Sequence, residues 1–121
     1  MGVIDKTRFD HWGIPTHEPK AGEKWLEPSR VWITNPRRHP AHVEFLRYAA
    51  DSPVSEFRRT NPHIAFRVAD VEQAIQGHKV LAGPNTVGNG FARIAFVEID
   101  GAVVELLQWP SLDYEGWFPE T

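Results

Sequence analysis

The sequence predicts an α+β domain made of two related halves. A recurring motif and a series of short apolar segments separated by turn residues support this fold class. In each half, a His inside one apolar segment is followed by a Glu inside another. The paired segments are Phe9-Asp10-His11-Trp12-Gly13-Ile14 with His42-Val43-Glu44-Phe45-Leu46-Arg47-Tyr48, and Asn61-Pro62-His63-Ile64-Ala65-Phe66 with Val103-Val104-Glu105-Leu106-Leu107-Gln108-Trp109. These segments are rich in β-branched and aromatic residues, so their His and Glu side chains are expected on strands.

The length and composition limit the possible classes of protein. With 121 residues, of which 41% are hydrophobic, we expect one domain over residues 1–121. The formal net charge is −3 and there is no extended basic cluster, which disfavours nucleic acid as a partner. No apolar run approaches the roughly 20 residues needed to cross a bilayer, so we expect a cytoplasmic protein that is not inserted in a membrane. The absence of cysteine means that any bound metal would be held by nitrogen and oxygen atoms.

The first half is expected to be mostly strands. Residues 8–15 are predicted to form the first strand, and His17–Pro28, rich in Pro, Gly, Lys and Glu, a loop or a single turn. Val31–Thr34 and His42–Tyr48 are predicted strands. The turn between them contains residues that disfavour both helix and strand pairing. The polar stretch Asp51–Thr60 is expected to link the halves.

The second half contains the predicted helix. His63–Val68 alternates as a strand, and Asp70 can cap a helix over Val71–Gly77. Phe91–Asp100 and Ala102–Trp109 are predicted to form a hairpin, because they are joined at Asp100-Gly101, a strong turn signal. The tail, residues 110–121, is expected to be irregular.

The spacing of the motifs differs between the halves by about one short helix. The interval between the two glutamates exceeds that between the two histidines, and the first half has a Pro-rich loop where the second has its helix. We therefore predict two β-α-β-β-β modules, at about residues 8–50 and 61–109, of which the first has been trimmed of its helix. In the second module His63, Ala65 and Arg67 share one face of their strand.

Four segments together resemble the glyoxalase and vicinal oxygen chelate superfamily. They are Asp-His-Trp-Gly-Ile at 10–14, Val-Glu-Phe-Leu at 43–46, Pro-His-Ile-Ala-Phe-Arg-Val at 62–68 and Asp-Gly-Ala-Val-Val-Glu-Leu at 100–106. The resemblance covers nearly the whole chain and implies a cup-shaped mixed sheet formed by the two modules. It also implies a divalent metal ion held by His11, Glu44, His63 and Glu105. This His/Glu/His/Glu pattern is most similar to the glyoxalase I and methylmalonyl-CoA epimerase branches.

The resemblance implies a metal-dependent isomerase, epimerase or lyase that removes a proton next to a carbonyl. Imidazole and carboxylate ligands suit Zn, Ni, Co, Mn or Fe, and leave room for two adjacent oxygens of a small substrate. Glu105 or Glu44 would be the catalytic base, and the sequence does not distinguish between them. Arg67 lies on the same face as His63, roughly 13 Å further along an extended strand, where it can meet the far end of a substrate. Further candidate substrate-binding residues are Tyr48, Leu107 and Trp109.

Two other functions stay open at this point. The first is a metal-free or vestigial ligand-binding module of the resistance type. The second is an Fe(II) extradiol-type dioxygenase. It is less favoured, because that chemistry normally uses two His and one carboxylate with more open positions, and the predicted set has two carboxylates. We also expect a homodimer, since trimmed modules leave sheet edges and aromatic surface to be covered.

Overall fold

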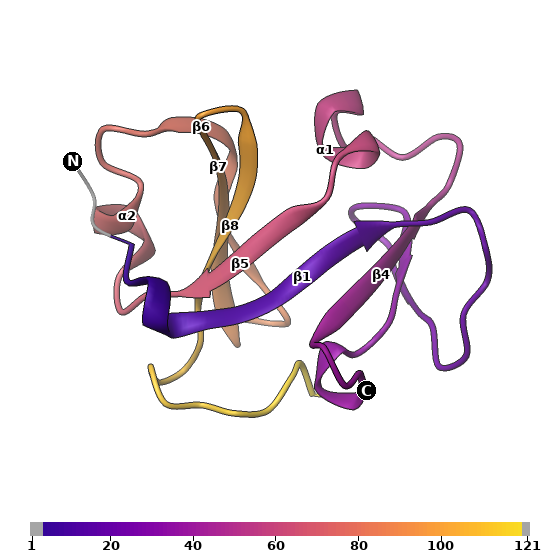
Figure 1. The fold of residues 1–121 in the computed structure, drawn as a ribbon, viewed down its shortest axis with the longest axis horizontal. Coiled ribbons are helices and arrows are strands. Elements are labelled where there is room, and N and C mark those ends of the chain that lie inside the picture. The colour runs from indigo at the N-terminus through magenta and orange to yellow at the C-terminus, as the bar shows by residue number, and fades with distance from the viewer. Residues whose placement is uncertain (1–3, 120–121) are drawn as a thin grey trace. The chain divides into compact units, whose positions relative to one another are not determined.

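The computed structural model describes residues 4–119, which contain eight strands and two short α-helices (Figure 1). The strands pair in the order β2-β3-β4-β1-β5-β8-β7-β6, so the chain forms an eight-stranded mixed sheet. The predicted α+β class is confirmed at this level, while the cup shape and the two modules stay predictions. No helix among the described residues has the length and apolar character required to span a membrane.

The chain divides into two compact units. The N-terminal unit is His11–His63, and the C-terminal unit consists of the described residues before His11 and after His63, which are 4–10 and 64–119.

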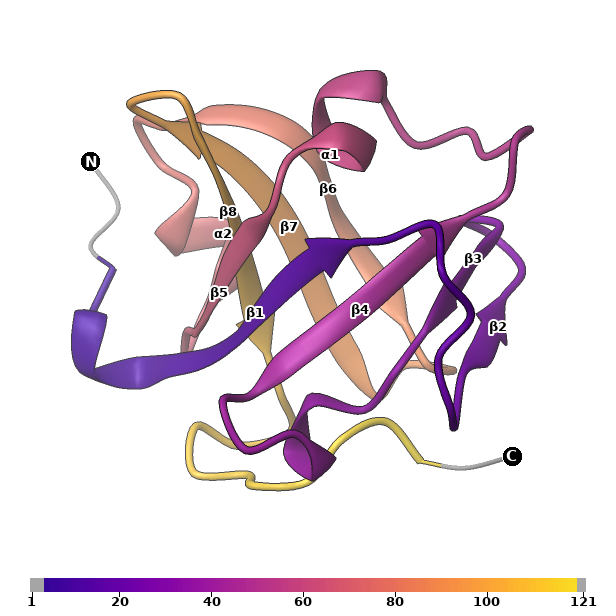
Figure 2. The ribbon, with the colours of Figure 1, turned by 45° about the vertical axis from the view of Figure 1, so that its right-hand side comes forward.

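The N-terminal unit is built on four strands and one helix (Figure 2). Their bounds are β1 Phe9–Pro15, β2 Lys24–Leu26, β3 Val31–Ile33, β4 Val43–Tyr48 and α1 Glu56–Thr60. Strand β1 pairs with β4 in parallel, whereas β3 pairs with both β4 and β2 in antiparallel fashion. A 3₁₀ turn at Pro36–Arg38 precedes β4, and Asn35 caps it by accepting a hydrogen bond from the backbone N–H of Arg37.

The C-terminal unit contains the remaining elements, together with Phe9 and Asp10 of β1, while His63 at the start of β5 belongs to the N-terminal unit. Their bounds are β5 His63–Arg67, α2 Val71–Ala74, β6 Lys79–Val87, β7 Ala92–Ile99 and β8 Ala102–Gln108. The β7–β8 hairpin turns at Asp100 and Gly101, whose φ angles are +50° and +85°. Positive φ at both central residues is what a tight type I′ hairpin turn needs, and Asp-Gly tolerates it. The predicted hairpin is therefore confirmed.

The side chains of β8 alternate between two faces, and each face contributes to a separate core cluster of the C-terminal unit. Leu106 belongs to the first cluster, which includes Val71 and Ala74 of α2, so the helix covers this face (Figure 1). Leu107 and Trp109 belong to the second cluster, which aromatic residues of the tail pack against. Neighbouring residues of a strand point to opposite faces, so β8 has apolar packing on both sides.

Four elements differ from the sequence-based expectations. The loop predicted at His17–Pro28 contains β2, and the linker predicted at Asp51–Thr60 contains α1. The helix expected over Val71–Gly77 ends at Ala74, and β6 was not predicted. In β2 the deciding interaction is the pairing with β3, which local sequence does not reveal. In β6 the Gly-Pro-Asn stretch reads as a turn, but β6 is at the edge of the sheet and shifts its register there, which accommodates proline.

Candidate metal centre

Three of the four predicted ligands lie within the N-terminal unit, each on a different strand. His11 lies on β1, Glu44 on β4, and His63 is the first residue of β5. The parallel pairing of β1 with β4 sets Glu44 opposite Gly13. All three side chains are buried, with exposed fractions of 0% for His11, 6% for Glu44 and 5% for His63. Burying polar groups is costly unless they are paired or bind a ligand, so this cluster is not explained by packing alone.

The two imidazoles converge on one carboxylate oxygen. Nε2 of His11 lies 3.4 Å from Oε1 of Glu44, and Nε2 of His63 lies 3.6 Å from the same atom. The two imidazole rings are 5.6 Å apart, in an edge-to-face arrangement. Neighbouring ligand atoms around an ion with metal–ligand bonds of 2.0–2.2 Å are about 3.0–3.6 Å apart. The observed separations therefore suit three ligands of one divalent ion.

Glu105 completes the set of four predicted ligands. It lies on β8, where it pairs with Phe96 of β7, and 7% of it is exposed. One ligand atom from each of His11, Glu44, His63 and Glu105 can be chosen so that all four lie within 4.8 Å of one another. Four buried His and Glu residues thus lie close enough to bind a metal ion. The donor set of two nitrogens and carboxylate oxygens fits Zn, Ni, Co, Mn or Fe(II), and does not select one of them.

Gly13 provides the space that the His63 ring occupies. A Cβ atom on Gly13 would lie 2.0 Å from Cε1 and 2.3 Å from Nε2 of His63, which is far inside contact distance. Any other residue would force the imidazole or the strand to move. Sequence reasoning assigned Gly13 no role, although a glycine in the interior of a strand is a recognised signal of close approach.

Two of the predicted substrate-binding residues lie in a buried network in the C-terminal unit. Nε of Arg67 donates to Oδ2 of Asp10 at 3.0 Å, and the same oxygen accepts from the indole N–H of Trp109 at 3.0 Å. Nη1 of Arg67 also donates to the backbone carbonyl of Tyr114. Arg67 and Trp109 thus tie Asp10 to the tail of the chain, a structural task that the sequence did not indicate.

The other two predicted substrate-binding residues have different surroundings. Leu107 is fully buried in the second core cluster, on the same face of β8 as Glu105. Tyr48 is half-buried and lines a cavity at the end of β4. A direct role of these residues in substrate binding stays a prediction. His42, the competitor of Glu44 on the same segment, is exposed.

Comparison with known proteins finds similarity among solved structures. No protein-family model matches the chain, and no curated protein matches it. Among solved structures, the chain is similar to the crystal structure of a hypothetical protein from Bacillus halodurans C-125, with a TM-score of 0.60 and 21% sequence identity. The match covers 83% of this chain and 92% of the other. At this identity the similarity concerns the fold alone.

Proposed function

We propose that the chain is a divalent-metal-dependent isomerase, epimerase or lyase of the glyoxalase type, acting on a small substrate with two adjacent oxygens. The observation that carries this proposal is the convergence of two buried imidazoles on Oε1 of Glu44, at 3.4 and 3.6 Å. The fourth buried ligand candidate, Glu105, and the fold similarity are compatible with the sequence resemblance.

His11, Glu44 and His63 would hold the ion, with Glu105 as the fourth ligand. A bound divalent ion supplies Lewis acidity, which stabilises negative charge on an oxygen next to the carbon that loses its proton. Burial of the four side chains excludes water and strengthens their electrostatic interactions.

Glu105 is the better candidate for the catalytic base. Oε1 of Glu44 lies beside both imidazoles, so moving that carboxylate would disturb two other ligands at once. Glu105 belongs to the C-terminal unit, and neither of these two short contacts to the imidazoles involves it. We therefore assign proton transfer to a carboxylate oxygen of Glu105 and a purely ligating role to Glu44.

Metal content and proton exchange test the proposal in two steps. Purified protein, stripped with chelator and reloaded separately with Zn, Ni, Co and Mn, is analysed for bound metal beside His63→Ala and the exposed control His42→Ala. We expect one ion per chain in the wild type and in His42→Ala, and loss of the ion in His63→Ala. If the wild type retains no metal, or His63→Ala retains it fully, the enzyme proposal is wrong and the metal-free binding module becomes the better hypothesis.

The second step measures exchange of the proton next to the carbonyl in D₂O by NMR, with a panel of hydroxyketones and 2-oxo acids. We expect the metal-loaded wild type to catalyse exchange, and Glu105→Gln to lose it by about 100-fold or more, since general-base catalysis typically contributes 10²–10⁴-fold. Glu44→Gln is the matched variant. It should bind less metal than the wild type, while its exchange rate per bound ion stays close to that of the wild type. Equal exchange per ion in Glu105→Gln and wild type would exclude Glu105 as the base.

One observation favours a second candidate, an Fe(II) dioxygenase. His11, His63 and Glu44 by themselves form a set of two histidines and one carboxylate, which is the ligand set of non-haem Fe(II) oxygenases. Anaerobic loading with Fe(II), followed by catechol and then oxygen, separates the two functions. Ring cleavage with oxygen uptake would favour the dioxygenase, and proton exchange without oxygen uptake would favour the isomerase or lyase.

A further inference from the structure

The N-terminal unit has an aromatic stripe on the face of its strands opposite Glu44. Trp25 of β2 pairs with Trp32 of β3, and Trp32 pairs with Arg47 of β4, so these three side chains share one face. Arg47 is three residues from Glu44 on the same strand, and successive side chains of a strand alternate between faces. The stripe is therefore separate from the candidate metal centre.

Arg47 is fixed in place within this stripe. Its Nε and Nη2 donate to the two carboxylate oxygens of Glu23 at 2.9 and 2.7 Å, and its Cζ lies 5.5 Å from the centre of the Trp32 ring. The hydrogen bond from Arg47 lowers the pKa of Glu23, and Glu23 in turn raises the pKa of Arg47. The pair is thus charged at neutral pH, and it holds the guanidinium in one orientation with the Nη1 hydrogens outside the pair.

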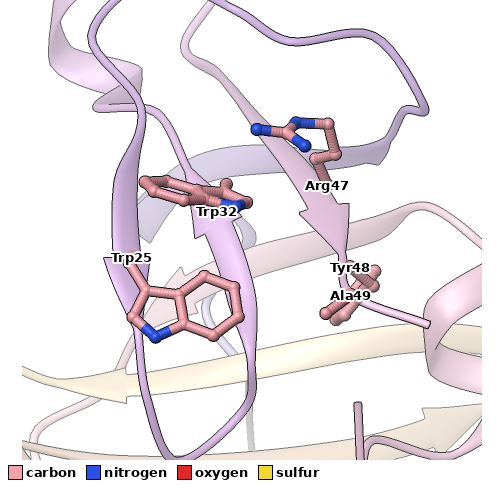
Figure 3. A pocket seen from close by; sticks show the side chains of 5 residues that line it. All are labelled: Trp25, Trp32, Arg47, Tyr48 and Ala49. Carbon is pink, nitrogen blue, oxygen red and sulfur yellow. The ribbon is translucent and has the colours of Figure 1, made fainter. Parts of the chain in front are cut away.

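A cavity of about 430 Å³ lies against this stripe (Figure 3). Its walls are Trp25, Trp32, Arg47, Tyr48 and Ala49. The indole rings of Trp25 and Trp32 are 5.2 Å apart and inclined by 55°, which gives the cavity two broad apolar surfaces. Cavities of this size, mostly aromatic with one or two fixed polar groups, are typical of small-molecule sites.

We propose that this cavity is a second binding site, for a small planar aromatic carboxylate. A planar ring can stack against the indole surfaces, and rigid aromatic walls lose little conformational freedom when they bind it. Of the described residues that line the cavity, Arg47 carries the only charge, and although Glu23 compensates that charge, the guanidinium offers the ligand donors and no acceptor, which suits a carboxylate better than an ammonium group. Nε and Nη2 are committed to Glu23, and the Nη1 hydrogens are therefore the donors offered to the ligand carboxylate. The site does not depend on the proposed metal.

Fluorine NMR of the full chain with 4-fluorobenzoate tests the proposal. The matched probes are 4-fluorobenzyl alcohol, which lacks the charge, and 4-fluorobenzylamine, which reverses it. We expect saturable line broadening with 4-fluorobenzoate, weaker binding of the alcohol, and the weakest binding of the amine. Absence of binding at millimolar 4-fluorobenzoate, or equal binding of the amine, would overturn the proposal.

Variants locate the binding. Trp32→Leu should abolish it, and Arg47→Lys should weaken it about tenfold, because an ammonium group keeps the charge but loses the planar fork. Trp25→Phe keeps an aromatic wall and should retain most of the affinity. It is the control for loss of binding through misfolding, because it also changes a tryptophan of the cavity. Trp12→Leu, at an exposed tryptophan outside the cavity, and His63→Ala, at the metal centre, should bind like the wild type. Wild-type binding by Trp32→Leu, or loss in Trp12→Leu, would show that the probe binds elsewhere.

Discussion

The C-terminal unit packs apolar side chains on both faces of its strands, whereas the N-terminal unit carries charged and ring-bearing side chains on both faces, beside buried apolar residues such as Val31, Ile33 and Leu46. In the C-terminal unit α2 covers one face and the aromatic tail covers the other. In the N-terminal unit one face carries Glu44 beside two imidazoles, and the other carries Trp25 beside Trp32, whose ring contacts the guanidinium of Arg47. Apolar packing supplies most of the stability of a domain, so the difference indicates that the C-terminal unit holds the fold and the N-terminal unit presents polar groups for binding.

The largest expected effect comes from a polar contact inside the C-terminal unit. Asp10 accepts hydrogen bonds from Arg67 and Trp109, and its side chain is fully buried. Asp10→Ala would leave the guanidinium without its carboxylate, which typically costs about 3–5 kcal/mol. Urea unfolding measures the loss, and Asp113→Ala, at an exposed ion pair with Arg8, is the control that should cost less than about 1 kcal/mol. Similar costs for the two variants would contradict this assignment.

A matched pair of leucine substitutions tests the comparison directly. Leu106 is fully buried in the first core cluster of the C-terminal unit, and Leu46 of β4 is 7% exposed in the N-terminal unit. We expect Leu106→Ala to reduce the free energy of unfolding by about 3–5 kcal/mol and Leu46→Ala by about 2 kcal/mol, since the cost rises with the cavity that remains. The free energies come from urea unfolding of both variants. An equal or larger loss for Leu46→Ala would show that the N-terminal unit also depends on apolar packing.

Gly13→Ala tests whether the ring of His63 needs the space that Gly13 leaves. The new Cβ would overlap the His63 ring, so we expect a loss of about 1–3 kcal/mol in stability, typical of overpacking, together with loss of metal binding. Calorimetric titration with Zn and urea unfolding give the two readouts. The double variant Gly13→Ala/His63→Ala is the control, and it should be no less stable than His63→Ala alone, because the overlap requires the ring. If the stability losses of Gly13→Ala and His63→Ala add up in the double variant, Gly13 is needed for its backbone conformation and not for the space that it leaves to the ring.

The candidate site was more predictable than its surroundings. His11, Glu44, His63 and Glu105 could be selected because each stands out as a polar residue within an apolar strand, and because the pattern occurs twice. Their role as ligands stays a prediction. The bond from Arg67 to Asp10 could not be predicted, since it joins strands far apart in the sequence and no local pattern pairs the two residues.

The fold was predictable where local signals were strong. The Asp100-Gly101 turn and the Asp70 cap are encoded within a few residues, and both form as expected. Strand β2 is three residues long and exists through its pairing with β3, so its formation depends on the rest of the sheet. Helix α1 begins after Ser55, whose hydroxyl accepts from the N–H of Arg58. This cap was overlooked in a stretch whose polarity suggested a linker.

The smallest expected effect concerns acid sensitivity of the N-terminal unit. The hydrogen bond from Arg47 lowers the pKa of Glu23 in the folded state below its unfolded value of about 4.3. A lowered pKa gives stability that is fully present above the unfolded pKa and is lost as the pH falls through the folded pKa. Wild type should therefore exceed Glu23→Gln in stability at pH 7 by a small margin, because the pair is near the surface, and the margin should shrink below about pH 4. Urea unfolding between pH 3 and pH 7 measures it. In an Arg47→Gln background, where the largest cause of the shift is removed, Glu23→Gln should have a smaller pH-dependent effect. A wild-type margin that grows as the pH falls would refute the assignment. If the margin behaves as expected, the ionised Glu23–Arg47 pair contributes to the stability of the N-terminal unit, and the orientation of Arg47 depends on pH in the same way.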